Sequence, residues 1–324
     1  MAREIKKILV IKLSALGDFV LALAAMKKIR EVHRKAHITL LTTPPFEGLA
    51  KACPYFNAVE TDGRPASLGE WAALRRRIKA AKYDRVYDLQ TSTQSARIFH
   101  LLAPFPPEWS GIAAGCALPH KNPGRNRMHT LERQADQLKY AGIWPDAPTE
   151  PGSAPGPDLS WVLPKPSQTR PVSGGVKPKP YVLFVPGGSA HRLDKRWPAE
   201  RYGQLGKILF ERGYDVVIIG GPQESALARQ IQRDVGQARD LTGRTDFARI
   251  AILGAKAALV VGNDTGPLHL AAAAGAPTVV MFSSASDPSL AAPRGHVTVV
   301  KGEDLTKLPV AEVLQAVNAL IPKP

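Results

Sequence analysis

Residues 257–274 read AALVVGNDTGPLHLAAAA, and this stretch decides how the rest of the chain is interpreted. The apolar, partly β-branched run 257–261 is typical of a buried parallel strand, and the alanine-rich run 270–274 favours a helix. The polar heptad from Asn263 to His269 is therefore predicted to be a strand-to-helix turn in an α/β domain.

A turn of this kind has the features of an anion site. Free backbone N–H groups and the positive end of the helix dipole attract phosphate or carboxylate. Gly266 allows a ligand to approach the backbone, and Pro267 suits a first helical turn. Asp264 or Thr265 can cap the helix, and His269 falls within one turn of the same end. A helix that is simply well capped explains the same residues, so the heptad alone leaves both interpretations open.

The charge of the chain indicates an anionic partner. The 324 residues suit two domains, and the net charge is +15. Residues 1–160 carry 23 basic and 15 acidic side chains and residues 161–324 carry 20 and 13, so the excess is +8 and +7. An even excess fits phosphorylated ligands or an anionic membrane surface better than a basic tail. Aromatic residues are only 6% of the chain, which argues against a nucleic-acid partner.

Several classes of protein are disfavoured by what the sequence lacks. No apolar run is long enough to span a bilayer and no signal peptide begins the chain, so we expect a cytoplasmic protein. Cys53 and Cys116 lack the spacing of a disulfide framework or zinc site. Metal-site motifs and a GxSxG nucleophile elbow are also lacking, so we predict no metal, no cofactor and no serine hydrolase.

Alternating strand and helix patterns divide the chain into two halves. A first domain, 1–160, is followed by a proline-rich linker, 161–180, and by a second domain, 181–309. Strands are predicted at 7–13, 37–42, 85–89, 181–185, 215–219 and 278–282, and helices at 19–32, 68–81, 132–142, 198–212 and 225–235. A tail helix within 310–324 can cross back onto the first domain. The fold class is α/β, with two Rossmann-like domains whose mostly parallel sheets face each other across a cleft.

In such sheets ligands bind beyond the carboxyl ends of the strands. The first such loop places Asp18 at the start of a long helix, where it is either a helix cap or a general base. The second-domain loop 186–198 carries Ser189 and Lys195, whose donors suit phosphate oxygens. Lys121, Arg125 and Arg127 share a loop whose charges suit an anionic acceptor or lipid headgroups. Ser14 lies in the same loop as Asp18, Gln90 begins the loop after the strand 85–89, and we expect both on the acceptor side.

Four motifs carry a resemblance to a known family. They read ILVIKLSALGD at 8–18, YDRVYDLQ at 83–90, DKRWP at 194–198 and DTGPLH at 264–269. In this order the chain, outside its linker, resembles the lipopolysaccharide heptosyltransferases of glycosyltransferase family 9. The resemblance implies a GT-B fold and inverting, metal-independent sugar transfer from a nucleotide donor, typically ADP-heptose. The implied acceptor is the lipopolysaccharide inner core, so the protein would lie peripherally on the cytoplasmic face of the inner membrane.

The resemblance also assigns roles to residues. Asp18 matches the family's catalytic carboxylate, which deprotonates the acceptor hydroxyl, and Lys195 matches the lysine on the donor phosphate. The remaining donor-side residues are those of the last motif, which would hold the diphosphate as leaving group: Asp264, Thr265, Gly266, Pro267 and His269. Charge on that group would be met by preoriented donors and by the helix dipole.

Three alternatives stay open. Family members with other donor sugars exist, and the long linker and the unmatched region 110–130 leave the acceptor open. A nucleotide-sugar epimerase of the same architecture would bind the donor and need no acceptor. The third alternative is a non-catalytic protein that binds anionic lipid or nucleic acid, and the net charge of +15 is its only support.

Overall fold

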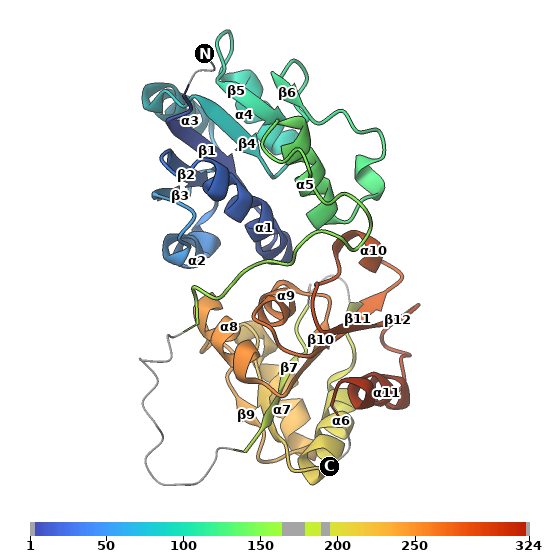
Figure 1. Ribbon diagram of the computed structural model, residues 1–324. Helices are drawn as coiled ribbons and strands as arrows, with labels where there is room; N and C mark the ends of the chain where they lie inside the picture. Colours follow the sequence, from blue (N-terminus) through green and yellow to red (C-terminus); the bar gives the residue numbers. More distant parts are fainter. Residues whose placement is uncertain (1–3, 164–178, 189–194, 322–324) are drawn as a thin grey trace. The chain divides into compact units, whose positions relative to one another are not determined.

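A computed structural model of the chain describes residues 4–163, 179–188 and 195–321. The chain divides into two compact units, Met1–Pro157 and Asp158–Pro324 (Figure 1). The division lies close to the predicted domain boundary at 160. Most of the predicted linker, 164–178, lies outside the described residues.

Unit 1 is built around a six-stranded sheet in which every strand pair is parallel. The order across the sheet is β3-β2-β1-β4-β5-β6. The strands are β1 (Lys7–Ile11), β2 (His37–Leu41), β3 (Ala58–Glu60), β4 (Arg85–Asp88), β5 (Glu108–Gly111) and β6 (Leu118–Pro119). Successive side chains of a strand point to opposite faces, so Leu9 and Ile11 of β1 join one core while Ile8 and Val10 point the other way.

Helices cover this sheet. They are α1 (Leu16–Val32), α2 (Glu47–Ala52), α3 (Leu68–Ala81), α4 (Thr93–Leu101) and α5 (Thr130–Tyr140), with 3-10 turns at Pro44–Phe46 and Arg125–Arg127. The core containing Leu9 also contains Leu74 of α3 and Ile98 of α4, while α1 packs against α5. Ser67 begins α3 because its Oγ accepts the N–H of Glu70 at 3.2 Å.

Unit 2 repeats the design with the sheet order β12-β11-β10-β7-β8-β9, again with parallel pairs. Its strands are β7 (Tyr181–Val185), β8 (Asp215–Ile218), β9 (Arg239–Asp240), β10 (Leu259–Asn263), β11 (Thr278–Ser283) and β12 (Val297–Gly302). Its helices are α6 (Ala199–Glu211), α7 (Ser225–Asp234), α8 (Phe247–Lys256), α9 (Gly266–Ala273), α10 (Pro288–Ala291) and α11 (Val310–Leu320), with a 3-10 turn at Pro222–Glu224.

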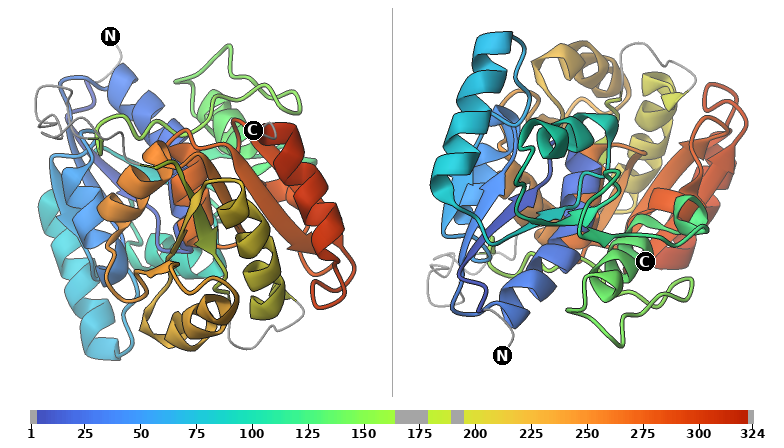
Figure 2. Two further views of the ribbon diagram at one scale, coloured as in Figure 1. Left: turned by 90° about the horizontal axis from the view of Figure 1, so that it is seen from below. Right: turned by 90° about the horizontal axis from the view of Figure 1, so that it is seen from above.

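The C-terminal helix α11 belongs to unit 2. Its apolar residues Val313, Ala316 and Val317 are part of the core that also contains residues of α6 and α7. Figure 2 shows α11, in red, beside β12 and α6, in agreement with its contacts. The sequence leaves open whether this helix crosses back onto the first domain, and the contacts described here are with its own unit. Amphipathic periodicity marks a buried face but does not say which sheet covers it.

Both sheets have the Rossmann strand order. The first strand of each unit lies in the middle, and successive strands are added first on one side of it and then on the other. The reversal lies between β1 and β4 in unit 1 and between β7 and β10 in unit 2. Ligands of such sheets bind beyond the carboxyl ends of the two strands at this point. The prediction of two Rossmann-like domains with parallel sheets is confirmed. The carboxyl edge of each sheet is therefore a candidate for a ligand site.

Candidate functional site

The carboxyl edge of the unit 2 sheet is organised by one buried amide. Asn263, the last residue of β10, is fully buried. Its Nδ2 donates to the carbonyls of Pro186 (2.9 Å) and Gly187 (3.0 Å), and its Oδ1 accepts the N–H of Trp197 (3.0 Å). A single side chain therefore fixes both ends of the loop 186–197 against the start of α9, and its hydrogen-bonding groups are satisfied as a buried amide requires.

A pocket of about 330 Å³ opens beside this amide. Its lining includes the predicted turn residues and a set of glycines, namely Asp264, Thr265, Gly266, Pro267, Gly187, Gly188, Gly220 and Gly221. Thr265 precedes α9 without capping it through its side chain, and its buried Oγ1 has no partner within the described residues. A buried hydroxyl without a partner at a helix N-terminus suits a bound anion.

The structure separates His269 from the pocket lining. Its ring Nε2 lies 3.0 Å from Oδ1 of Asp264, and the ring is almost fully buried. His269 thus contacts the Asp264 carboxylate, and its predicted role in holding the diphosphate stays a prediction. Asp264, Thr265, Gly266 and Pro267 do line the pocket.

Two predicted donor residues lie in the preceding loop. Nζ of Lys195 donates to Oγ of Ser286, which follows β11, at 2.5 Å. This contact joins the loop after β7 to the loop after β11. Ser189 lies outside the described residues.

At the unit 1 edge, Gln90 holds the loop that leads to Asp18. Its Oε1 accepts the N–H groups of Leu13 (2.9 Å) and Ser14 (3.2 Å). The hydroxyl of Ser14 accepts a hydrogen bond from Arg64. Asp18 lies half-buried in the first turn of α1, and its Oδ2 accepts the N–H of Ala15 at 3.3 Å. The structure thus brings Ser14, Gln90 and Asp18 together, with Gln90 supporting the loop.

Buried charges surround this loop. Lys12 is almost fully buried, and its Nζ donates to the carbonyl of Leu89 at 3.5 Å. Burial lowers the pKa of Lys12 to about 8, a shift that Asp18 and Asp88 oppose and that Arg133 of α5 increases. Below that pH the ammonium of Lys12 stays charged.

Asp88 ends β4 and shapes the next loop. Its Oδ1 accepts the N–H groups of Gln90 (3.0 Å) and Thr91 (2.9 Å), and Thr91 has a φ of 43°. Burial raises the pKa of Asp88 to about 6 in spite of these hydrogen bonds. The carboxylate therefore holds the backbone that positions Gln90.

Comparison with known proteins identifies the family. The model described as glycosyltransferase family 9 (heptosyltransferase) matches residues 71–316. The chain belongs to glycosyltransferase family 9. Lipopolysaccharide heptosyltransferase 2 of Escherichia coli is 27% identical over 90% of this chain and 86% of its own length.

Solved structures show the same fold. The E. coli ADP-heptose lps heptosyltransferase II has a TM-score of 0.77 at 24% identity, covering 97% of this chain and 98% of that one. An E. coli heptosyltransferase solved with ADP has a TM-score of 0.74 at 21% identity, covering 97% and 100%. The GT-B expectation is confirmed, and membership of the family makes the protein a glycosyltransferase.

Sequence reasoning missed several polar groups of this family 9 glycosyltransferase. Helix α5 is largely buried although it is rich in polar residues. Gln137 of this helix donates to the carbonyl of Asp88 at 3.0 Å. The charge of Arg133 interacts electrostatically with Lys12 and with Asp18. A run of charges on a helix is usually a solvated face, so only the fold could reveal these contacts.

The basic residues of the predicted acceptor loop differ in their burial. Arg125 is half-buried in a polar network, whereas Lys121 and Arg127 are exposed. Among the described residues there is no group of three or more histidine, cysteine and carboxylate side chains that could hold a metal ion. No helix in the described ranges is long and apolar enough to cross a membrane.

Proposed function

We propose that this glycosyltransferase transfers a heptose from ADP-heptose, with inversion and without a metal, to the core of a lipopolysaccharide or similar anionic glycan on a lipid. The observation that carries the proposal is the unit 2 pocket, where the start of α9, the unpartnered Thr265 hydroxyl and four glycines face one cavity. The names of the relatives supply the sugar and the nucleotide, since they read heptosyltransferase and ADP-heptose.

The donor diphosphate would lie against α9. Gly266, the first residue of α9, lines the pocket at the positive end of the helix dipole. The missing side chains of Gly187 and Gly188 leave the backbone open to phosphate oxygens. Lys195 would add a charge from the neighbouring loop. These groups would stabilise negative charge on the departing diphosphate, the part that a metal plays in other enzymes.

Asp18 would act as the general base. It would remove the proton of the acceptor hydroxyl as that oxygen attacks the anomeric carbon, and the bond from that carbon to the diphosphate would break with its electrons on the leaving oxygen. A single displacement of this kind inverts the anomeric centre. The side chain of Lys12 would add a positive charge beside the loop that carries Asp18.

The acceptor would be bound by unit 1. Arg125, Lys121 and Arg127 form the basic loop that suits its anionic groups, and Ser14 lies beside Asp18 in the loop that Gln90 supports. An acceptor of this kind would bring the protein to the cytoplasmic face of the inner membrane, where we expect it to bind peripherally.

The experiment that tests the function is a transfer assay with purified protein. ADP-, GDP- and UDP-sugars are first ranked by thermal shift, and transfer from ADP-heptose to a lipopolysaccharide that lacks heptose is then followed by mass spectrometry. We expect the ADP-sugar to bind best and a heptosylated acceptor to form. Free nucleotide with an isomerised sugar in the absence of acceptor would instead indicate an epimerase. Salt-sensitive DNA binding without nucleotide affinity would indicate a binding protein.

A further inference from the structure

A second pocket lies on the same edge of the unit 2 sheet. It measures about 490 Å³ and opens beyond the ends of β11 and β12, whereas the pocket at α9 lies over β7, β8 and β10. Its polar lining consists of hydroxyls and charges: Ser283, Ser284, Ser286, Asp287, Lys301 and Glu303. None of these residues has a part in the function proposed above.

The walls of this pocket are fixed by hydrogen bonds. Oδ1 of Asp287 accepts the N–H of Ser289 at 2.9 Å and begins α10. Oγ of Ser284 donates to the carbonyl of Glu303 at 2.9 Å, which ties the loop after β11 to the end of β12. The Asp287 carboxylate and the backbone of both loops are therefore held in place before any ligand arrives.

Lys195 contacts the wall of the second pocket. Its Nζ donates to Oγ of Ser286, a lining residue of the second pocket. Three features follow one another along the carboxyl edge of the sheet. Glu224 lies beyond β8, the start of α9 lies beyond β10, and the second pocket lies beyond β11 and β12. A nucleoside, a diphosphate and a sugar follow one another in the same order in a nucleotide-diphosphate sugar.

We propose that the second pocket binds the sugar ring of the donor, with its hydroxyls hydrogen-bonded to Asp287 and Glu303. This assignment rests on the function proposed above and adds the direction of the donor along the edge. Carboxylates accept hydrogen bonds from sugar hydroxyls, and serine hydroxyls and Lys301 can donate to them. The nucleoside then lies on the β8 side, near Glu224.

Calorimetry with two ligands tests the assignment. The variants are Asp287→Asn, whose amide oxygen can still cap α10, and Glu303→Gln. We expect the Kd for ADP-heptose to rise about 5- to 10-fold in each, because a hydrogen bond to a charged group is lost, while the Kd for ADP stays within about twofold. Glu312→Gln, an exposed carboxylate on α11, is the matched control and should change neither.

Other outcomes overturn the assignment. Equal losses of ADP and ADP-heptose affinity, an unchanged ADP-heptose Kd, or a raised acceptor KM with unchanged donor binding would each show that the pocket does not hold the donor sugar. Wild-type protein that binds neither nucleotide would contradict the proposed function itself.

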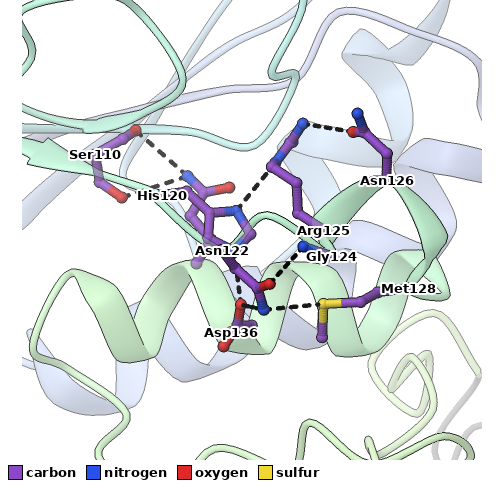
Figure 3. A network of polar contacts seen from close by, with 9 residues as sticks. Ser110, His120, Asn122, Gly124, Arg125, Asn126, Met128 and Asp136 are labelled. Atoms are coloured by element: carbon purple, nitrogen blue, oxygen red, sulfur yellow. Dashed lines mark hydrogen bonds and ion pairs between the residues drawn. The ribbon is translucent and has the colours of Figure 1, made fainter.

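A polar network in unit 1 carries a second, independent inference (Figure 3). Oδ2 of Asp136 lies 2.8 Å from Nε2 of His120 and accepts Nδ2 of Asn122 at 2.7 Å. On the other side of the ring, Nε of Arg125 donates to Nδ1 of His120 at 3.3 Å. Since an ionised carboxylate only accepts and a guanidinium only donates, the ring is neutral with its proton on Nε2.

The surroundings keep His120 neutral. Burial lowers the pKa of His120, the bond to Asp136 opposes this shift, and the charges of Arg125 and Arg133 increase it. The ring of Tyr140 lies 5.4 Å from that of His120, centroid to centroid. A protonated ring would lose its acceptor at Nδ1 and repel Arg125, so the contact requires the neutral form.

We infer that His120 positions Arg125 for an anionic group of the acceptor. Two contacts fix the guanidinium, one from Nε to His120 and one from Nη1 to Oδ1 of Asn126 at 2.8 Å. Fixing the guanidinium in advance reduces the entropy lost when it binds an anion. This role rests on the proposed function, because it concerns the acceptor side of the same reaction.

Two substitutions of one residue separate the contacts of His120. In His120→Asn the amide oxygen can replace Nδ1 as acceptor for Arg125, and in His120→Gln the amide nitrogen can replace Nε2 as donor to Asp136. We expect His120→Gln to raise the acceptor KM about 5- to 10-fold, as Arg125→Gln does, with the donor KM unchanged. His120→Asn should stay close to wild type, and His120→Gln should add little to Arg125→Gln.

Further readouts keep the inference falsifiable. The wild-type acceptor KM should rise in acid as His120 is protonated, and His120→Asn should lack this rise. Equal losses in His120→Asn and His120→Gln, or additive losses with Arg125→Gln, would overturn the positioning role. An unchanged acceptor KM in Arg125→Gln would overturn it as well, while continued sugar transfer would leave the proposed function in place.

Discussion

At the carboxyl edge of the unit 2 sheet lie glycines, a helix N-terminus and the fully hydrogen-bonded amide of Asn263. The unit 1 sheet has buried charges at the corresponding place, where its strand order also reverses. Backbone N–H groups bind a fully ionised diphosphate without having to titrate. In unit 1, by contrast, burial shifts the pKa of Lys12 and of Asp88. This difference supports our proposal that unit 2 holds the leaving group and that unit 1 moves the proton.

The largest expected effect is on turnover in unit 1. Asp18→Asn keeps the shape of the side chain but cannot accept the proton, so kcat should fall by a factor of about 100 or more. The measurement is a steady-state transfer assay. Glu31→Gln, an exposed carboxylate on the same helix, serves as the control and should keep full activity. Full turnover of a folded Asp18→Asn variant would remove Asp18 from the role of base.

Next in size is an effect on the stability of unit 2. Asn263→Ala leaves the Pro186 and Gly187 carbonyls and the Trp197 N–H without their partner, so unfolding should require about 3 kcal/mol less free energy. Denaturant titration measures the change. Asn318→Ala, which removes one contact with Arg212, should lower the unfolding free energy by about 1 kcal/mol or less. Equal losses of unfolding free energy in the two variants would contradict the organising role of Asn263.

A somewhat smaller effect concerns the packing that places α9. A Cβ on Gly254 of α8 would lie 2.6 Å from Cα of Ala271, so Gly254→Ala should destabilise unit 2 by about 1–3 kcal/mol. Gly48 of α2 has open space around its Cβ position. Gly48→Ala should therefore stabilise unit 1 by up to about 1 kcal/mol through helix propensity. Melting curves of the two variants that shift in the same direction would contradict this contrast.

A further effect is a pH dependence of the stability of unit 1. The folded pKa of Asp88 is about 6 and lies above its ordinary value of 3.8, so the folded protein binds the proton more tightly. The resulting stability is fully present below about pH 4 and is lost as the pH rises through about 6. In Asp88→Asn this slope in the unfolding free energy should disappear, as denaturant titrations across this range would show. A variant with an unchanged slope would contradict the assignment.

The sequence predicted the elements whose signals are local. Helix α3 and strand β7 have the bounds that periodicity indicates, 68–81 and 181–185. Helix α8 was missed although Asp246 caps it, since Oδ1 of Asp246 accepts the N–H of Arg249 at 2.7 Å. Strands β6 and β9 contain two residues each, too few for any pattern.

The same distinction applies to the site. The unit 2 turn could be predicted because Asp264 to Pro267 are contiguous and each has a backbone reason to be there. Lys12, Asp88 and Arg133 come from three segments, and only the fold brings their charges together. The contact of His269 with Asp264 was also out of reach, because spacing shows proximity and not the direction of a ring.

The measurement that tests the division of labour most directly is the calorimetric affinity for ADP of two variants. Lys195→Ala should weaken ADP binding about tenfold, because a charge beside the diphosphate is lost, whereas Asp18→Asn should bind ADP within about twofold of wild type. Unchanged ADP affinity in Lys195→Ala, or an equal loss in Asp18→Asn, would contradict the account that unit 2 holds the leaving group and unit 1 the base.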